Sequence, residues 1–100
     1  MTTSETNGPR WTQDQAIAYE AALEAINDVI AGYSAQIGIE RNASPPNIHR
    51  MEWLRMRVRQ ARDVAESLDV TDDASVQQVL SEYSAIVRAR DAAEAFARAA

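Results

Sequence analysis

The sequence predicts an all-α protein that folds as a three-helix antiparallel bundle, and three observations lead to this prediction. Apolar residues recur at spacings of three and four along three long segments, which is the period of an amphipathic helix. Stretches rich in proline or aspartate separate these segments. No segment shows the strict alternation of a half-buried strand. We expect a disordered polar tail at 1–10 and a single helical domain at 11–100.

The first helix is expected over about 12–38. Thr12 is followed by Gln15 three residues later, the arrangement of a capping box, in which two side chains bind the free amide groups at a helix start. Gly38 is expected to cap the C-terminus, where glycine is the commonest residue. The apolar face predicted for this helix consists of Ala16, Tyr19, Leu23, Ile26, Ile30, Tyr33 and Ile37.

The second helix is expected over about 48–68. The segment ERNASPPN at 40–47 carries two adjacent prolines, which cannot continue the first helix. Either Ser44 or Asn47 supplies the N-terminal cap of the second helix. Its predicted apolar face consists of Met51, Leu54, Val58, Ala61, Ala65 and Leu68.

The third helix is expected over about 72–98, after the turn DVTDDAS at 69–75. Either Thr71 or Asp72 caps it, since short polar side chains are preferred at this position. The turn lacks the glycine and the distal glutamate of a calcium loop, so capping is the preferred interpretation. Because both turns are short, neighbouring helices should run antiparallel, with coiled-coil-like packing. The predicted apolar face is Val76, Val79, Tyr83, Ile86, Arg90, Ala93 and Ala97.

The composition excludes several classes of function. Without cysteine, the chain forms no disulfide, thiolate metal site or cysteine nucleophile. A net charge of −5 disfavours binding to nucleic acid or to an anionic membrane. No stretch has the roughly 18 apolar residues of a membrane span, and MTTSETNGPRW lacks the features of a signal peptide. The ten cationic residues are all arginine, which together with abundant alanine suggests a GC-rich bacterial coding sequence, and the absence of cysteine fits a cytoplasmic protein.

Half of the arginines lie in one segment, HRMEWLRMRVRQAR at 49–62. We expect most of them to pack along the bundle and to pair with acids, as in Arg59–Asp63 and Arg62–Glu66. Nucleic-acid binding through this helix is an alternative, but the interleaved acids argue against it. Some of these arginines could instead meet an acidic partner protein.

Arg90 falls within the apolar face of the third helix. An unpaired charge is costly there, so we expect it to reach an acid such as Glu94 or Glu20. A further alternative is a small helical enzyme or anion-binding protein in which Arg50, Arg57 and Arg90 hold the anion. No cofactor or metal is predicted, because His49 has no second histidine or cysteine with which to bind a metal.

A second stripe of residues at helical spacing, from His49 to Gln60 and including Trp53 and Met56, lies on the second helix, roughly opposite its apolar face. If this helix were central in the bundle, its neighbours would cover the stripe. We favour the interpretation that the stripe is exposed and binds a partner, since Trp and Met are enriched at interfaces. The sequence thus predicts a non-catalytic interaction module, such as a regulator, an adaptor or an antitoxin- or immunity-like binder, with a second copy or another helical protein as partner. The predicted partner-binding residues are His49, Trp53, Met56 and Gln60.

Overall fold

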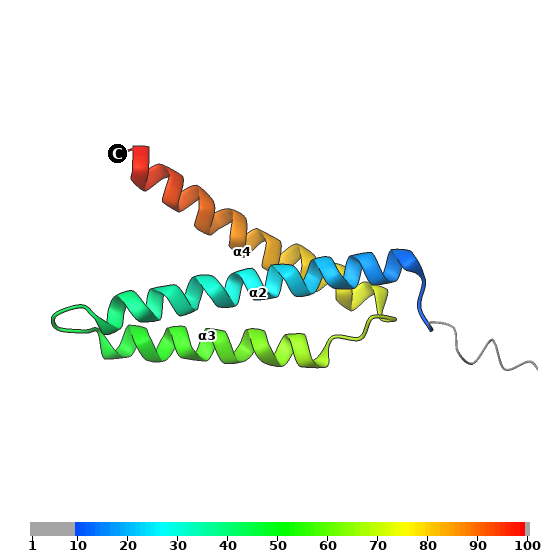
Figure 1. The fold of residues 1–100 in the computed structure, drawn as a ribbon, viewed down its shortest axis with the longest axis horizontal. Coiled ribbons are helices and arrows are strands. Elements are labelled where there is room, and N and C mark those ends of the chain that lie inside the picture. The colour runs from blue at the N-terminus through cyan, green and yellow to red at the C-terminus, as the bar shows by residue number, and fades with distance from the viewer. Residues whose placement is uncertain (1–9, 100) are drawn as a thin grey trace, which may run out of the picture.

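The computed structural model describes residues 10–99, and this part of the chain is three helices without a strand (Figure 1). These are α2 (Gln13–Arg41), α3 (Ile48–Ser67) and α4 (Asp73–Ala99). The predicted all-α class and the order of the three helices are confirmed. The tail predicted at 1–10 lies outside the described residues, apart from its last residue.

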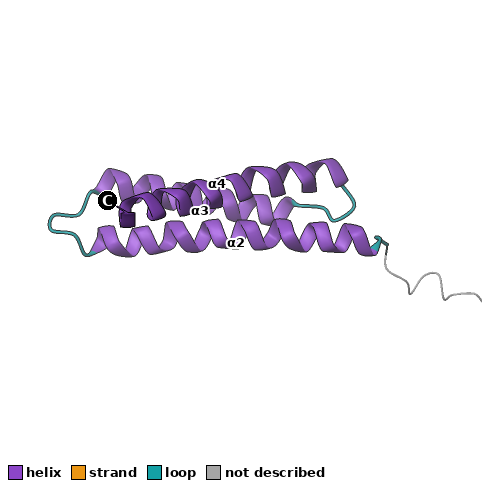
Figure 2. Cartoon of the chain, turned by 90° about the horizontal axis from the view of Figure 1, so that it is seen from above, coloured by secondary structure: helices purple, strands orange, loops and turns teal. Residues whose placement is uncertain are grey.

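The helix α2 is the central element of the fold. It packs against both α3 and α4, whereas over the described residues no Cα atom of α3 lies within 8 Å of a Cα atom of α4. Figures 1 and 2 show α2 and α3 as an antiparallel pair joined by the loop at one end. α4 starts beside the N-terminus of α2 and then diverges, so that its C-terminus lies apart (Figure 1). The alternative in which the second helix occupies the centre is therefore wrong.

The start of α2 is fixed by the predicted capping box. The Thr12 hydroxyl accepts a hydrogen bond from the Gln15 amide at 3.1 Å, and Gln15 Oε1 accepts one from the Thr12 amide at 2.8 Å. The prediction that Gly38 caps the C-terminus is wrong, because α2 continues to Arg41 and ends at Asn42. Gly38 does not adopt the positive φ angle that a glycine cap uses.

The other two helices each use one of the two caps that the sequence offered. Asn47 Oδ1 accepts a hydrogen bond from the Arg50 amide at 3.1 Å, which fixes the start of α3. Asp72 Oδ1 accepts one from the Ser75 amide at 3.1 Å, which fixes the start of α4. Each cap satisfies an amide that has no partner within its helix.

The buried side of α3 contains four of the six residues of its predicted apolar face, whereas the other two, Ala65 and Leu68, are half-buried. Leu54 is 0% exposed, and it packs in one cluster with Ile37, Met51 and Val58. On α2 the buried arc is wider than the single predicted stripe. Val29 is also buried, and it lines a small cavity shared with Ile86 and Val87 of α4. This second contact follows from the central position of α2.

The C-terminal end of α4 packs against no other helix. All side chains at 91–99 are exposed, and Phe96 is 78% exposed. Ala93 and Ala97 belong to the predicted apolar face but are not buried, because α4 has diverged from α2 at this point (Figure 1).

Candidate functional site

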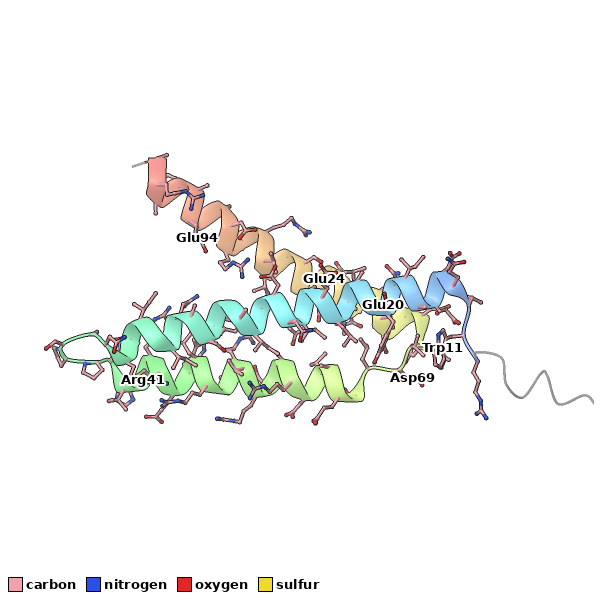
Figure 3. All side chains as sticks on the ribbon, in the orientation of Figure 1. Trp11, Glu20, Glu24, Arg41, Asp69 and Glu94 are labelled. Atoms are coloured by element: carbon pink, nitrogen blue, oxygen red, sulfur yellow. The ribbon has the colours of Figure 1, made fainter. Side chains whose placement is uncertain are left out.

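The residues predicted to bind a partner lie on the outer surface of α3. His49, Trp53, Met56 and Gln60 are all exposed, with Trp53 at 45% and Met56 at 37%. We call these four residues the Trp/Met stripe. The opposite side of the same helix is buried against α2, and α4 does not approach α3 closely enough to cover the stripe. Figure 3 shows the side chains of α3 that point away from α2.

The indole of Trp53 is held in place by three neighbours. The ring of Tyr33, on α2, meets it edge to face, with centroids 5.9 Å apart and an interplanar angle of 84°. The guanidinium groups of Arg50 and Arg57 lie 6.0 and 5.9 Å from the indole centroid. Both contacts are within the range of cation–π attraction. Trp53 is therefore an exposed aromatic side chain that contacts three neighbouring side chains.

Arg50 and Arg57 bind only neutral groups. Arg50 Nη2 donates a hydrogen bond to Gln36 Oε1 at 2.8 Å. Arg57 Nη1 donates to Gln60 Oε1 at 3.1 Å, and its Nε donates to the Tyr33 hydroxyl at 3.3 Å. Among the described residues, neither arginine has a carboxylate within 4 Å, so both lie unpaired beside the Trp/Met stripe.

A second set of arginines lies on the other flank of α3. Arg55, Arg59 and Arg62 line a groove of about 330 Å³ between α3 and α2. Its wall on α2 includes Arg41, and its lining contains no carboxylate. We call this feature the arginine groove. The remaining lining residues are Ser34 and the buried pair Ile37 and Val58.

The groove and the stripe form one continuous surface. Arg55 and Arg59 also line a shallow hollow on the outer side of α3. The other residues of this hollow are Trp53 and Met56, together with Glu52. A partner bound to the Trp/Met stripe would therefore also contact the guanidinium groups of Arg55 and Arg59 at the edge of the stripe.

The ion pairs predicted within α3 are absent. Among residues 10–99, every ion pair within 4 Å involves Arg90 or Arg98 of α4, so neither Arg59–Asp63 nor Arg62–Glu66 forms. The order of the residues explains this in part, since an acid placed four residues before a base is the better arrangement on a helix. All five arginines of α3 are consequently without a carboxylate partner.

Arg90 reaches across from α4 to α2. Its Nη1 pairs with Asp28 Oδ1 at 3.0 Å, and it also contacts Asp91 at 3.1 Å and Glu94 at 3.8 Å. Hydrogen bonds to Asp28 and Asp91 raise the pKa of Arg90. The pair with Glu94 was predicted, but Asp28 was missed. An anion bound at Arg90 would have to compete with these carboxylates, unlike one at Arg50 or Arg57.

Two further observations concern other kinds of site. Within residues 10–99, no group of three or more His, Asp or Glu side chains is placed to hold a metal ion. None of α2, α3 and α4 is long and apolar enough to cross a bilayer.

The fold and this surface define a small all-α protein with an exposed aromatic and cationic face on α3. Comparison with known proteins adds no family to this description. No family model matches the sequence, and no similar curated protein or solved structure is found.

Proposed function

We propose that the protein is a non-catalytic helical interaction module that binds a helical surface through the outer face of α3. The exposure of Trp53 on the side of α3 that faces away from the buried Met51, Leu54 and Val58 carries this proposal. Tyr33, Arg50 and Arg57 already contact the indole, so we expect little conformational entropy to be lost when a partner covers it. Trp and Arg are also the residues that most often dominate binding energies at interfaces.

Several roles fit such a surface. A regulator, an adaptor, or an antitoxin- or immunity-like binder needs a recognition face and no reaction centre. The arginine-only cation content and the lack of cysteine support a place in the bacterial cytoplasm. A second copy of the chain is one such helical partner, and its binding can be measured with the purified protein alone.

The test is light scattering of the purified chain over a range of concentrations, for the wild type and for Trp53→Ala. We expect the wild type to self-associate. Trp53→Ala should raise the protein concentration at which half of the chains are associated by at least about tenfold. Phe96→Ala is the matched control, since Phe96 is an aromatic side chain that is 78% exposed near the C-terminal end of α4. A wild type that stays monomeric near millimolar concentration, or an equal effect of both substitutions, would overturn the proposal.

A further inference from the structure

The charges of the described residues are segregated between two neighbouring helices. On α3, Arg55 and Arg59 are exposed and pair with no carboxylate. On α2, Glu20 and Glu24 are exposed and have no cation within 4 Å. Figure 3 labels both glutamates on α2. A molecule with one basic and one acidic ridge is electrostatically complementary to itself.

The two ridges also match in spacing. Glu20 and Glu24 are four residues apart, as are Arg55 and Arg59, so each pair spans about 6 Å along its helix. The planar guanidinium group can bind a carboxylate through two parallel hydrogen bonds. Ile17, which is 59% exposed, lies one turn before Glu20 and adds apolar area to the same side of α2.

We propose that the partner of α3 is the α2 helix of a second copy, with Glu20 and Glu24 of one chain placed against Arg55 and Arg59 of the other. This inference rests on the function proposed above and specifies its partner. The contact buries the Trp/Met stripe, while the carboxylates reach the arginines at its edge. Because two different faces meet, a closed dimer forms when both such contacts are made at once.

The same arginines are poorly suited to a polyphosphate chain. The net charge of −5 repels nucleic acid, and Glu52, Asp63 and Glu66 interrupt the basic surface of α3. A second copy also carries a net charge of −5, but this repulsion is weaker than that from a duplex, whose phosphates place one negative charge about every 1.7 Å along the axis. The observations therefore favour an acidic helix as the occupant.

Charge reversal tests the proposal. Arg55→Glu/Arg59→Glu and Glu20→Arg/Glu24→Arg should each weaken self-association about 100-fold, because like charges then face each other. Mixing the two variants should restore association to within about tenfold of the wild type, since both contacts again join opposite charges. Light scattering and sedimentation of each variant alone, and of an equimolar mixture, give the three affinities.

The matched control is Arg88→Glu/Arg98→Glu on α4, which changes the net charge by the same amount as the α3 variant. We expect this control to change the affinity of self-association by less than about fivefold. Glu20→Arg/Glu24→Arg brings the net charge closer to zero, so overall repulsion cannot explain a loss of association by this variant. Circular dichroism confirms that each variant keeps its helices.

Three results would overturn the inference. The mixture could fail to restore association, the control could weaken it as much as the α3 variant, or a 20-base-pair DNA duplex could bind the wild type more tightly than a second copy does. If Trp53→Ala weakens association while neither charge variant does, the proposed function stands and this assignment of the partner fails.

Discussion

Arg90 of α4 lies directly against Gly32 of α2. A Cβ atom at position 32 would come within 2.8 Å of Arg90 Nη1 and 3.3 Å of its Cδ. The absence of a side chain at Gly32 therefore leaves the space in which the guanidinium group reaches Asp28, one helical turn earlier. Glycine at position 32 thus allows the ion pair that links α4 to α2. It also makes α2 less stable than alanine would at the same position.

Gly32→Ala should uncouple Arg90 from Asp28 without destabilising the protein. Alanine stabilises a helix interior by up to about 1 kcal/mol relative to glycine. The partly exposed ion pair is worth only about 0.5 kcal/mol. A double-mutant cycle with Asp28→Asn and Arg90→Gln should give that coupling energy in the wild type and almost none in the Gly32→Ala background. An unchanged coupling energy would show that the side chain at 32 does not displace Arg90.

Leu54→Ala should be strongly destabilising. Leu54 is 0% exposed at the centre of the α2–α3 contact, so its truncation leaves a cavity and removes buried apolar area. We expect a loss of about 3 kcal/mol in the free energy of unfolding, measured with urea at low protein concentration. Ile48→Ala is the control, since Ile48 is 56% exposed and its truncation should cost less than about 0.5 kcal/mol. Equal effects would contradict the assigned core.

Thr12→Ala should lower the free energy of unfolding by about 1 kcal/mol, because it removes the acceptor for the Gln15 amide. Thr12→Ser keeps a hydroxyl at the same place and should cost much less. Thermal unfolding followed by circular dichroism compares the two variants. If serine proves as harmful as alanine, the hydroxyl is not what stabilises the start of α2.

Asp69 should make the turn between α3 and α4 sensitive to acid. Its Oδ1 accepts hydrogen bonds from the Thr71 amide at 2.9 Å and from the Thr71 hydroxyl at 2.8 Å, and these bonds lower the pKa of Asp69. A lowered pKa in the folded state means that the ionised form stabilises the fold above the unfolded pKa, near 4. This contribution is lost as the pH falls through the lower, folded pKa.

Asp69→Asn should therefore be less stable than the wild type at pH 7, and the difference should shrink below about pH 4. Urea unfolding at pH 7, 5 and 3 measures this trend. A difference that stays constant with pH would show that the charge on Asp69 plays no part. Asp63→Asn, an exposed aspartate on α3 without an ion pair, should show no comparable trend.

The sequence predicted the local features of the fold best. The capping box at Thr12 and the buried face of α3, including Met51 and Leu54, depend on residues close together in the chain. Gly38 was misassigned because glycine also occurs inside helices, and the chain remained helical until the loop that carries two prolines. Local pattern therefore located both ends of α3 and α4 to within one residue and failed only at the C-terminus of α2.

Relationships between distant helices were harder to predict. The apolar spacing could not show that α2 contacts two neighbours, so the burial of Val29 was missed. The pair between Arg90 and Asp28 was missed for the same reason, since these residues are 62 positions apart in the sequence. The exposure of the Trp/Met stripe was expected, because its four residues lie opposite the buried face of their own helix.

The position of α2 between two helices that do not approach each other has a consequence for how the molecule comes apart. Each outer helix has its own seam with α2, so opening one seam need not open the other. The losses in the free energy of unfolding caused by a substitution in the α2–α3 contact and by one in the α2–α4 contact should therefore be additive. Amide hydrogen exchange would then report two separate opening reactions, with the slowest amides shared in the middle of α2.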